Sequence, residues 1–154
     1  MESRCVVRKA VIGDSEAIKD IVNWHAERGM MLSRSVADVQ QDIRSFHVAE
    51  AGGKVVGCCG LRIYYPDVAE IRSLAVRKQN KRRGIGTMLT QACLEEAKNL
   101  GAKSVLTLTY VPEFFIKLKF KPVDKNKLHP KIWGDCISCH KFPDCDENAL
   151  IRKI

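Results

Sequence analysis

The sequence predicts a single α/β domain in which a central mixed β-sheet is flanked by about four helices. Antiparallel hairpin signals come first along the chain, and a strand–helix–strand crossover follows them. The length of 154 residues suits one domain spanning 1–154 and allows a sizeable core. Because 45% of the residues are apolar, intrinsic disorder is excluded as the state of the chain.

The N-terminal half predicts a strand, two helices and a hairpin. "CVVRKA" has a strand pattern, and "GDSEAIKDIVNWHAERG" predicts a helix that Asp14 or Ser15 can cap. The apolar stripe of this helix comprises Ala17, Ile18, Ile21 and Val22. A short helix is expected from Ser35, with Val36, Val39 and Ile43 on one face. "FHVAEAGGKVVGCCGLRIYY" then predicts two strands joined at Gly52 and Gly53.

The C-terminal half predicts the crossover and the closing strands. "DVAEIRSLAV" is a strand pattern, and "GTMLTQACLEEAKNLG" is a helix that Gly101 ends. The residues expected on one side of that helix are Met88, Leu89, Ala92, Cys93 and Ala97. "AKSVLTLT" predicts a strand, and "PEFFIKLKF" predicts a short helix that begins at Pro112. "FKPVD" and "NALIRKI" predict the last strands.

The formal net charge of +8 indicates an anionic partner, which can be a small molecule as well as a nucleic acid. The basic residues are spread along the chain with few aromatic residues among them, so we expect no nucleic acid partner. No apolar run is long enough to cross a bilayer, and "MESRCVVRKA" has no apolar signal core. We therefore expect a cytoplasmic protein with no membrane partner.

A basic turn with two glycines precedes the best-defined helix. Five basic residues occur between positions 77 and 83, and Gly84 and Gly86 follow at once. The first N–H groups of a helix lack partners and lie at the positive end of its dipole, so they bind phosphate well. Glycines there let a ligand approach the backbone. The alternative is a surface turn whose charges are simply solvated. Neither the dinucleotide fingerprint nor the NTP loop is present.

The stretch "EIRSLAVRKQNKRRGIGTMLTQACLEEAKNLG" resembles the acetyl-CoA signature of the GNAT acetyltransferases, R/Q-x-x-G-x-G/A, except that Lys81 occupies the first position. The resemblance covers nearly the whole chain. It is closest to the N-acetylglutamate synthases in their short bacterial form, which has no amino-acid-kinase domain. The segments that carry this narrower likeness are "MLSRS", "GLRIYYPDVAEIRSLAV", "LTLTYVPEFF" and "KIWGDCISCHKFPDCDENAL".

The resemblance implies acetyl-CoA as co-substrate, with no metal required for the chemistry. In the family the pantetheine arm binds as an added strand at the end of the signature strand, and the turn N–H groups hold the pyrophosphate. Lysine in place of a forked donor should weaken this site without abolishing it. The residues so implied are Leu74, Ala75, Val76, Lys81, Arg82, Arg83, Gly84, Ile85, Gly86 and Thr87.

Acetyl transfer to an amine needs a base for the ammonium proton and donors for the carbonyl oxygen. By resemblance the base is Glu70, whose alternative role is an ion pair with a neighbouring arginine such as Arg72. The backbone at Ser73 or Leu74 is the expected oxyanion donor. The tyrosine that many relatives use as an acid is replaced by phenylalanine and isoleucine, so Tyr110 is the nearby candidate.

The acceptor glutamate carries two carboxylates, which arginine binds best. The resemblance implies Leu32, Arg34, Arg62 and Lys131 as acceptor residues, each cation having the alternative of a solvated surface charge. The longer synthases hold substrate with an arginine and a serine before the last strand, where this chain has "CDEN". Glutamine or another amino acid is therefore an alternative acceptor.

Seven cysteines are an odd number and do not form a disulfide framework of the secreted type. Cys58, Cys59 and Cys93 read as small apolar fillers. The tail residues Cys136, Cys139 and Cys145 are candidates for a structural metal site, for a redox-sensitive pair or for simple packing.

These observations lead to a cytoplasmic acetyltransferase that moves acetyl from acetyl-CoA to the α-amine of glutamate for arginine biosynthesis. One alternative is the same fold acting on another amine, such as a protein lysine or another amino acid. A second alternative is a module that binds an acyl-CoA without catalysis. The expected partners are the amino acid and acetyl-CoA, and the resemblance is compatible with a homodimer.

Overall fold

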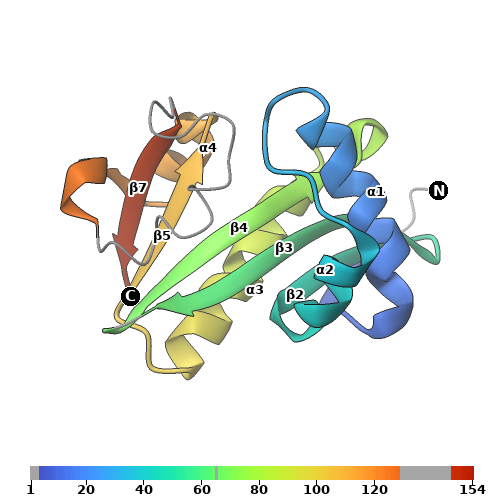
Figure 1. The fold of residues 1–154 in the computed structure, drawn as a ribbon, viewed down its shortest axis with the longest axis horizontal. Coiled ribbons are helices and arrows are strands. Elements are labelled where there is room, and N and C mark those ends of the chain that lie inside the picture. The colour runs from blue at the N-terminus through green and yellow to red at the C-terminus, as the bar shows by residue number, and fades with distance from the viewer. Residues whose placement is uncertain (1–3, 65, 129–146) are drawn as a thin grey trace.

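The computed structural model describes residues 4–64, 66–128 and 147–154. Within these ranges one sheet has the strand order β1-β2-β3-β4-β5-β7-β6 (Figure 1). Its strands are β1 Cys5–Lys9, β2 Phe46–Ala51, β3 Lys54–Tyr64, β4 Val68–Val76, β5 Ser104–Thr109, β6 Lys121–Pro122 and β7 Asn148–Lys153. The α-helices are α1 Ser15–Ala26, α2 Val36–Gln41, α3 Ile85–Asn99 and α4 Pro112–Lys117. The predicted mixed sheet with about four helices is confirmed.

The strand pairing follows the chain except at one crossover. β1 to β4 pair in antiparallel fashion, and the turn between β2 and β3 has φ 60° at Gly52 and 77° at Gly53. Positive φ at both positions is what a two-residue hairpin turn of matching twist requires, so the predicted hairpin is confirmed. β4 pairs with β5 in parallel, and α3 makes the connection between them.

Helices cover both faces of the sheet (Figure 1). On one face, α3 buries Leu89 and Cys93 against β3 and β4, in a cluster that includes Leu61 and Ile71. On the other face, α1 and α2 bury a second cluster, which comprises Ile18, Ile21, Val22, Val39, Phe46, Val48, Cys58 and Ala75. None of the helices in the described ranges has the length and apolar character that crossing a bilayer would need.

The buried face of α3 differs from the predicted one most clearly at Met88, and Ala92 is only partly buried. Met88 is 37% exposed, whereas Ile85, Leu89, Cys93 and Ala97 are buried. These four residues form one row at a spacing of four, and Met88 lies beside that row on the helix surface. The prediction for Met88 was therefore wrong, and Ile85 takes its place in the core.

Helix α1 begins where predicted, although its start is held in a different way. Asp14 occupies the N-cap position, yet its carboxylate makes no cap bond. That carboxylate accepts a hydrogen bond from the Val11 N–H at 2.8 Å and two from the Arg8 guanidinium at 2.8 and 3.0 Å. Ser15 donates to the Ile12 carbonyl at 2.7 Å. The pair with Arg8 ties α1 to β1 and lowers the pKa of Asp14.

Asp14→Asn should lower the free energy of unfolding at pH 7 by about 1–2 kcal/mol, because the charged pair with Arg8 is lost. The folded-state pKa lies below the ordinary value of about 3.9, so the carboxylate contributes fully above that pH. Its contribution is lost as the pH falls through the lowered value. Urea unfolding at pH 7 and at pH below about 4 should show the gap between wild type and variant narrowing.

The matched control is Asp20→Asn on the same helix, where the side chain is 58% exposed and pairs with Lys19. An exposed pair of this kind is worth about 0–1 kcal/mol. Equal losses in the two variants would contradict the role given to Asp14.

Candidate active site

The parallel pairing of β4 with β5 ends partway along both strands. It runs from Val68 opposite Ser104 to Ile71 opposite Thr107. At that point the Thr107 hydroxyl donates to the Ile71 carbonyl at 3.3 Å. β4 continues to Val76, and β5 continues to Thr109 paired only with β7, which lies on its other edge along its whole length. The two strands therefore diverge, and the edge of β4 from residue 72 onward borders an opening in the sheet.

A β-bulge lies in β4 at this opening. β3 pairs Cys58 with Ala75 and Gly60 with Arg72, so Cys59 is opposite both Ser73 and Leu74. Ser73 has φ 54°, a left-handed conformation that costs a residue other than glycine about 1–2 kcal/mol. A bulge redirects backbone groups away from the regular ladder. The residues predicted to supply the oxyanion donor are thus the ones whose backbone leaves the ladder.

The basic turn forms an open end of α3. Gly84 is the N-cap of the helix with φ 76°, and no side chain caps it. The side chains of Lys81, Arg82 and Arg83 are exposed, and the first turn of α3 carries no acidic residue. Partnerless N–H groups and positive charge meet here, as the sequence predicted for an anion site.

The two glycines of the signature have separate structural reasons. A Cβ at Gly84 would meet nothing within 4 Å, so its positive φ is what favours glycine. A Cβ at Gly86 would lie 3.3 Å from the ring of Phe114 in α4. Gly86 therefore lets α4 pack closely on the start of α3, which is a reason that the sequence did not reveal.

The last turn of α1 is held against the end of β4. His25 Nε2 donates to the Val76 carbonyl at 3.0 Å, and burial lowers the pKa of this imidazole. A neutral ring with its proton on Nε2 satisfies that contact. Beside it, the Trp24 ring lies 3.6 Å from the Arg28 guanidinium and 5.8 Å from Lys81 Nζ. His25 and Trp24 are neighbours of the basic turn that sequence reasoning missed.

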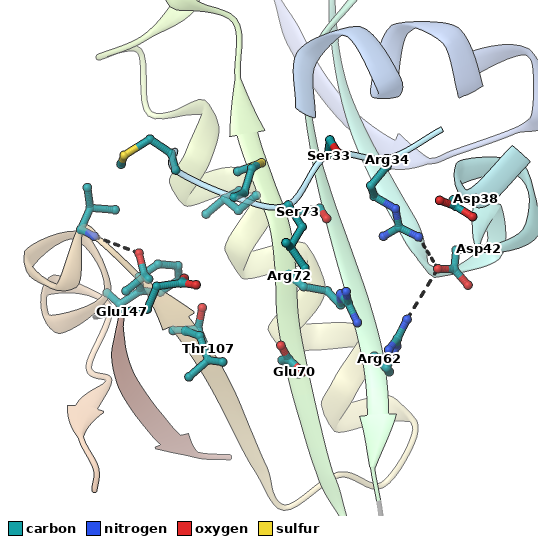
Figure 2. A pocket seen from close by; sticks show the side chains of 18 of the residues that line it. Ser33, Arg34, Asp38, Asp42, Arg62, Glu70, Arg72, Ser73, Thr107 and Glu147 are labelled. Carbon is teal, nitrogen blue, oxygen red and sulfur yellow. Dashed lines mark hydrogen bonds and ion pairs between the residues drawn. The ribbon is translucent and has the colours of Figure 1, made fainter. Parts of the chain in front are cut away.

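A cavity of about 550 Å³ lies on the α1 and α2 side of the sheet, where β4 and β5 diverge (Figure 2). Six of the predicted site residues of β3, β4 and the α1–α2 loop line it: Leu32, Arg34, Arg62, Glu70, Ser73 and Leu74. Its walls also include Met30, Met31, Ser33, Asp38, Gln41, Asp42, Arg72, Thr107, Leu108, Thr109, Val111, Phe115 and Glu147.

The predicted base, Glu70, is only 8% exposed and lies directly across the β3–β4 ladder from Arg62. The Tyr64 phenol hydrogen bonds with Glu70, and burial with the negative charge of Glu70 raises the pKa of Tyr64 to about 12. Tyr64 therefore keeps its proton at neutral pH and can donate it to the carboxylate. Sequence reasoning missed Tyr64, although its position two residues from Arg62 on the same strand face could have indicated it.

Two arginines of the cavity share one carboxylate. Arg34 Nη2 donates to Asp42 Oδ2, and Arg62 Nη2 lies 3.7 Å from the same oxygen. The side chain of Arg34 is 12% exposed. The Asn23 side chain in α1 holds the Arg34 backbone by bonds of 2.8 and 2.9 Å. Asp42 and Asn23 were both missed from the sequence.

Arg72 is a third arginine of the same cavity. Its partner across the ladder is Gly60, where a Cβ would lie 3.6 Å from Arg72 Cγ and 3.2 Å from the Arg72 carbonyl oxygen. The closer of these contacts is with the backbone, so glycine at this position lets β3 lie close to the β4 backbone beside Arg72. Figure 2 shows Arg34, Arg62 and Arg72 extending toward the same part of the cavity, near Asp42. The sequence analysis considered Arg72 only as a possible partner of Glu70.

Other predicted residues lie outside this assembly. Tyr110 does not line the cavity, whereas its neighbours Val111 and Phe115 do. Lys131 and the candidates Cys136, Cys139 and Cys145 lie outside the described residues. In the ranges that the structure describes, no group of three or more His, Cys, Asp or Glu side chains could hold a metal ion.

An opened strand edge beside a basic helix start, next to a cavity with a buried carboxylate, defines a transferase for a phosphate-bearing donor. A sequence profile of the Acetyltransferase (GNAT) family matches residues 17–114, and the chain belongs to this family. The chain is therefore an acetyltransferase, and its co-substrate is acetyl-CoA. The family resemblance seen in the sequence is confirmed.

Two relatives and two solved structures illustrate the likeness. An uncharacterized N-acetyltransferase of Chlorobaculum tepidum is 38% identical over 148 residues, 96% of each chain. An amino-acid acetyltransferase of Mycobacterium tuberculosis is 31% identical over 137 residues, 87% of this chain and 78% of that one. N-acetylglutamate synthase from Neisseria gonorrhoeae, complexed with coenzyme A and N-acetyl-glutamate, aligns with a TM-score of 0.88 at 25% identity. That alignment covers 99% of this chain and 36% of the synthase. A M. tuberculosis protein in complex with CoA aligns with a TM-score of 0.83 at 27% identity, over 97% of this chain and 99% of that one.

Gly84→Ala should destabilise the protein by about 1–2 kcal/mol, because alanine must adopt a left-handed conformation there. The loss is conformational, since nothing lies within 4 Å of the added Cβ. Urea unfolding measures it. Gly13→Ala is the control: it also has open space but no positive φ, and it should be neutral or stabilising by up to about 1 kcal/mol. Similar losses in both variants would contradict this explanation.

Proposed function

We propose that this acetyltransferase moves the acetyl group of acetyl-CoA to the α-amine of L-glutamate, with L-glutamine as the alternative acceptor. The observation that carries the proposal is the convergence of Arg34, Arg62 and Arg72 on one cavity with Glu70. An amino acid with two carboxylates needs cations for both and a base for its ammonium group. The product would serve arginine biosynthesis.

The donor would lie along the open edge of β4. Its pantetheine arm would bond to the backbone between Leu74 and Val76, beyond the end of the β4–β5 ladder at Ile71. The pyrophosphate would bind the N–H groups from Arg82 to Thr87 at the start of α3, with Lys81 and Arg83 adding charge. The thioester then lies by the bulge at Ser73, next to the acceptor cavity.

The chemistry requires a neutral amine. Glu70 would take the ammonium proton, directly or through a water, and Tyr64 would keep the carboxylate oriented by its hydrogen bond. The amine nitrogen attacks the thioester carbon, and backbone N–H groups at Ser73 and Leu74 stabilise the oxyanion. The C–S bond then breaks, and coenzyme A leaves as a thiolate that takes up a proton. Tyr110 stays a prediction as the acid, although it does not line the cavity.

The acceptor carboxylates would be held by arginines that Asp42 positions. Arg34 and Arg62 both pair with Asp42, which keeps their forks side by side with donors to spare. Arg72 supplies a third fork and can replace the arginine and serine of the longer synthases. Leu32 lines the same wall. Lys131 remains a prediction, because it lies outside the described residues.

A second candidate is acetylation of another amine, such as a protein lysine. The observation that favours it is the acidic side of the cavity, to which Asp38, Asp42 and Glu147 contribute. The name of the M. tuberculosis relative, an amino-acid acetyltransferase, supports the first candidate. The cytoplasmic location, the homodimer and the absence of nucleic acid and membrane partners stay predictions.

The test is release of coenzyme A thiol from acetyl-CoA with glutamate, glutamine and the other amino acids as separate acceptors. We expect turnover with glutamate, or with glutamate and glutamine. Glu70→Gln should lower kcat by about 10²- to 10⁴-fold, as loss of a general base does. Activity with a lysine peptide but with no amino acid would replace the first candidate by the second. Binding of acetyl-CoA without any turnover would favour a module without catalysis.

Arg34→Gln should raise the KM for the amino acid about 10- to 100-fold, because a charge-assisted bond to a carboxylate is lost. The KM for acetyl-CoA should change little, since Arg34 lines the acceptor side of the cavity. Steady-state kinetics with each substrate varied in turn measure both. Arg44→Gln is the matched control, because Arg44 is exposed and is not part of the cavity. An equal rise in both KM values would contradict the assignment.

A further inference from the structure

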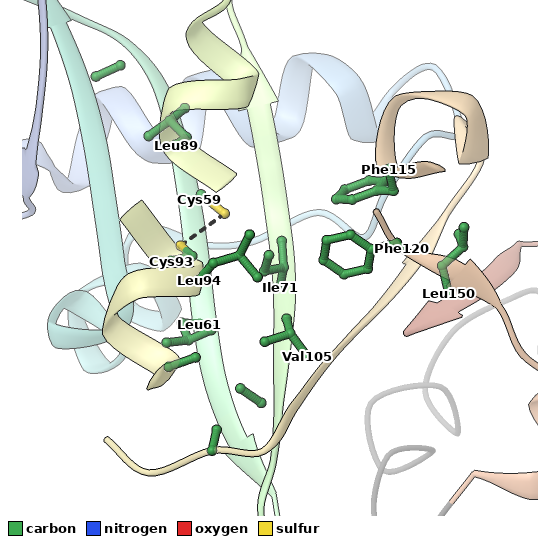
Figure 3. Close-up of a cluster of buried hydrophobic side chains, with 14 of the residues drawn as sticks. Cys59, Leu61, Ile71, Leu89, Cys93, Leu94, Val105, Phe115, Phe120 and Leu150 are labelled. Atoms are coloured by element: carbon green, nitrogen blue, oxygen red, sulfur yellow. Dashed lines mark hydrogen bonds between the residues drawn. The ribbon is translucent and has the colours of Figure 1, made fainter. Parts of the chain in front are cut away.

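Two cysteines and a histidine meet beneath α3, away from the acceptor cavity. Cys59 on β3 and Cys93 on α3 have their Sγ atoms 3.3 Å apart (Figure 3). Both are free cysteines with 0% exposure. His47 on β2 places its Nδ1 3.7 Å from Cys93 Sγ. The mechanism proposed above uses none of these three side chains.

A chain of charged groups connects this thiol pair with the surface. His47 Nδ1 lies 3.6 Å from Glu96 Oε2, and Lys9 Nζ lies 2.9 Å from Glu96 Oε1. The exposed fraction of the side chain rises from 10% at His47 to 28% at Glu96 and 44% at Lys9. Protons therefore have a polar route to Cys93, whose own side chain has no exposed surface.

The two sulfurs differ in their chemical character. The contacts with Cys59 and His47 lower the pKa of Cys93, although burial opposes the shift. The contact with Cys93 and burial raise the pKa of Cys59. Cys93 is thus the sulfur that ionises more readily of the two. A thiolate beside a second thiol is the arrangement of an attacking and a resolving cysteine.

We propose that Cys59 and Cys93 are a thiol modification site, which hydrogen peroxide or another small hydroperoxide converts reversibly into a disulfide. The Cys93 thiolate attacks one peroxide oxygen, the O–O bond breaks, and the departing hydroxide takes up the proton that Cys93 released on ionising, which forms water. Cys93 is then a sulfenic acid. The Cys59 sulfur attacks Cys93 Sγ, the S–S bond forms, the S–O bond breaks, and the second water leaves with the Cys59 proton. Two thiols are oxidised, and one peroxide is reduced to two waters.

The disulfide would join two elements that border the donor site, and this consequence rests on the proposed function. Closing the sulfurs from 3.3 Å to about 2.0 Å draws α3 toward β3. Cys59 is opposite the bulge residues Ser73 and Leu74, and α3 begins at the proposed pyrophosphate site. Because close-packed elements shift together, the oxidised protein should bind coenzyme A more weakly, by about fivefold or more.

The experiment treats the full chain with hydrogen peroxide, alkylates the remaining thiols and maps the linked peptides by mass spectrometry. We expect a Cys59–Cys93 linked peptide that dithiothreitol removes. In Cys59→Ala, dimedone should instead trap Cys93 as the sulfenic acid. In His47→Gln, the rate of Cys93 oxidation should fall by about tenfold or more. Circular dichroism establishes that each variant is folded.

Cys58→Ala is the matched control. Cys58 adjoins Cys59 and is also fully buried, but it lies in the α1 cluster on the other face and bonds to the Ser73 carbonyl. Its variant should still form the Cys59–Cys93 link.

Peroxide treatment that links only other cysteines, or leaves Cys93 unmodified in the folded protein, would overturn the modification site. Unchanged coenzyme A affinity of the linked protein would overturn the coupling to the donor site while the disulfide stands. If the oxidised protein binds coenzyme A more weakly but the reduced protein acetylates no amino acid, the proposed function alone would be contradicted.

Discussion

The end of the β4–β5 ladder at Ile71 and Thr107 determines where every part of the site lies. Parallel strands that stay paired leave no backbone group for a ligand. Here the pairing of β4 with β5 ends at Ile71, so the rest of β4 keeps an open edge on which an extended donor can pair as a strand would. The same divergence creates the cavity on the acceptor side. The bulge at Ser73 lies between the two, so the strained backbone sits where the donor and acceptor would meet.

The cavity can bind an anionic acceptor through its arginines. Two of them, Arg34 and Arg62, also have a partner of their own in the cavity. A guanidinium that is 12% exposed, as in Arg34, needs a partner, and Asp42 supplies one for both Arg34 and Arg62. Each fork has five N–H donors, so pairing with Asp42 leaves donors for an incoming carboxylate. Asp42 thus orients the arginines and also opposes a second anion. Because Asp42 repels an incoming carboxylate, a ligand that also brings an ammonium group to Glu70 would be favoured over a simple anion.

Local sequence signals predicted the elements well, and contacts distant in sequence were missed. Gly52 and Gly53 specify the hairpin, and Ser35 caps α2 by accepting from the Asp38 N–H, because these signals act within a few residues. The family resemblance indicated Arg34, Arg62 and Glu70, which the fold brings together. Arg72 was undervalued because its place depends on the β3–β4 register, and no sequence signal marks the positive φ of Ser73. Met88 was misassigned because the helix row runs through Ile85.

Cys59 and Cys93 are buried in the apolar core as predicted, but the proximity of their sulfurs was missed for a related reason. They are 34 residues apart, and nothing in either local segment indicates that their sulfurs approach within 3.3 Å. Size alone would allow alanine at both positions, since each lies among apolar side chains. With alanine in place of Cys93, the buried imidazole of His47 would lose a polar contact. Leaving a buried polar group unsatisfied costs about 1–3 kcal/mol. The His47–Glu96–Lys9 chain is therefore consistent with a sulfur that exchanges protons. It connects Cys93, in the middle of α3, with the surface, whereas the first turn of α3 lies at the proposed donor site.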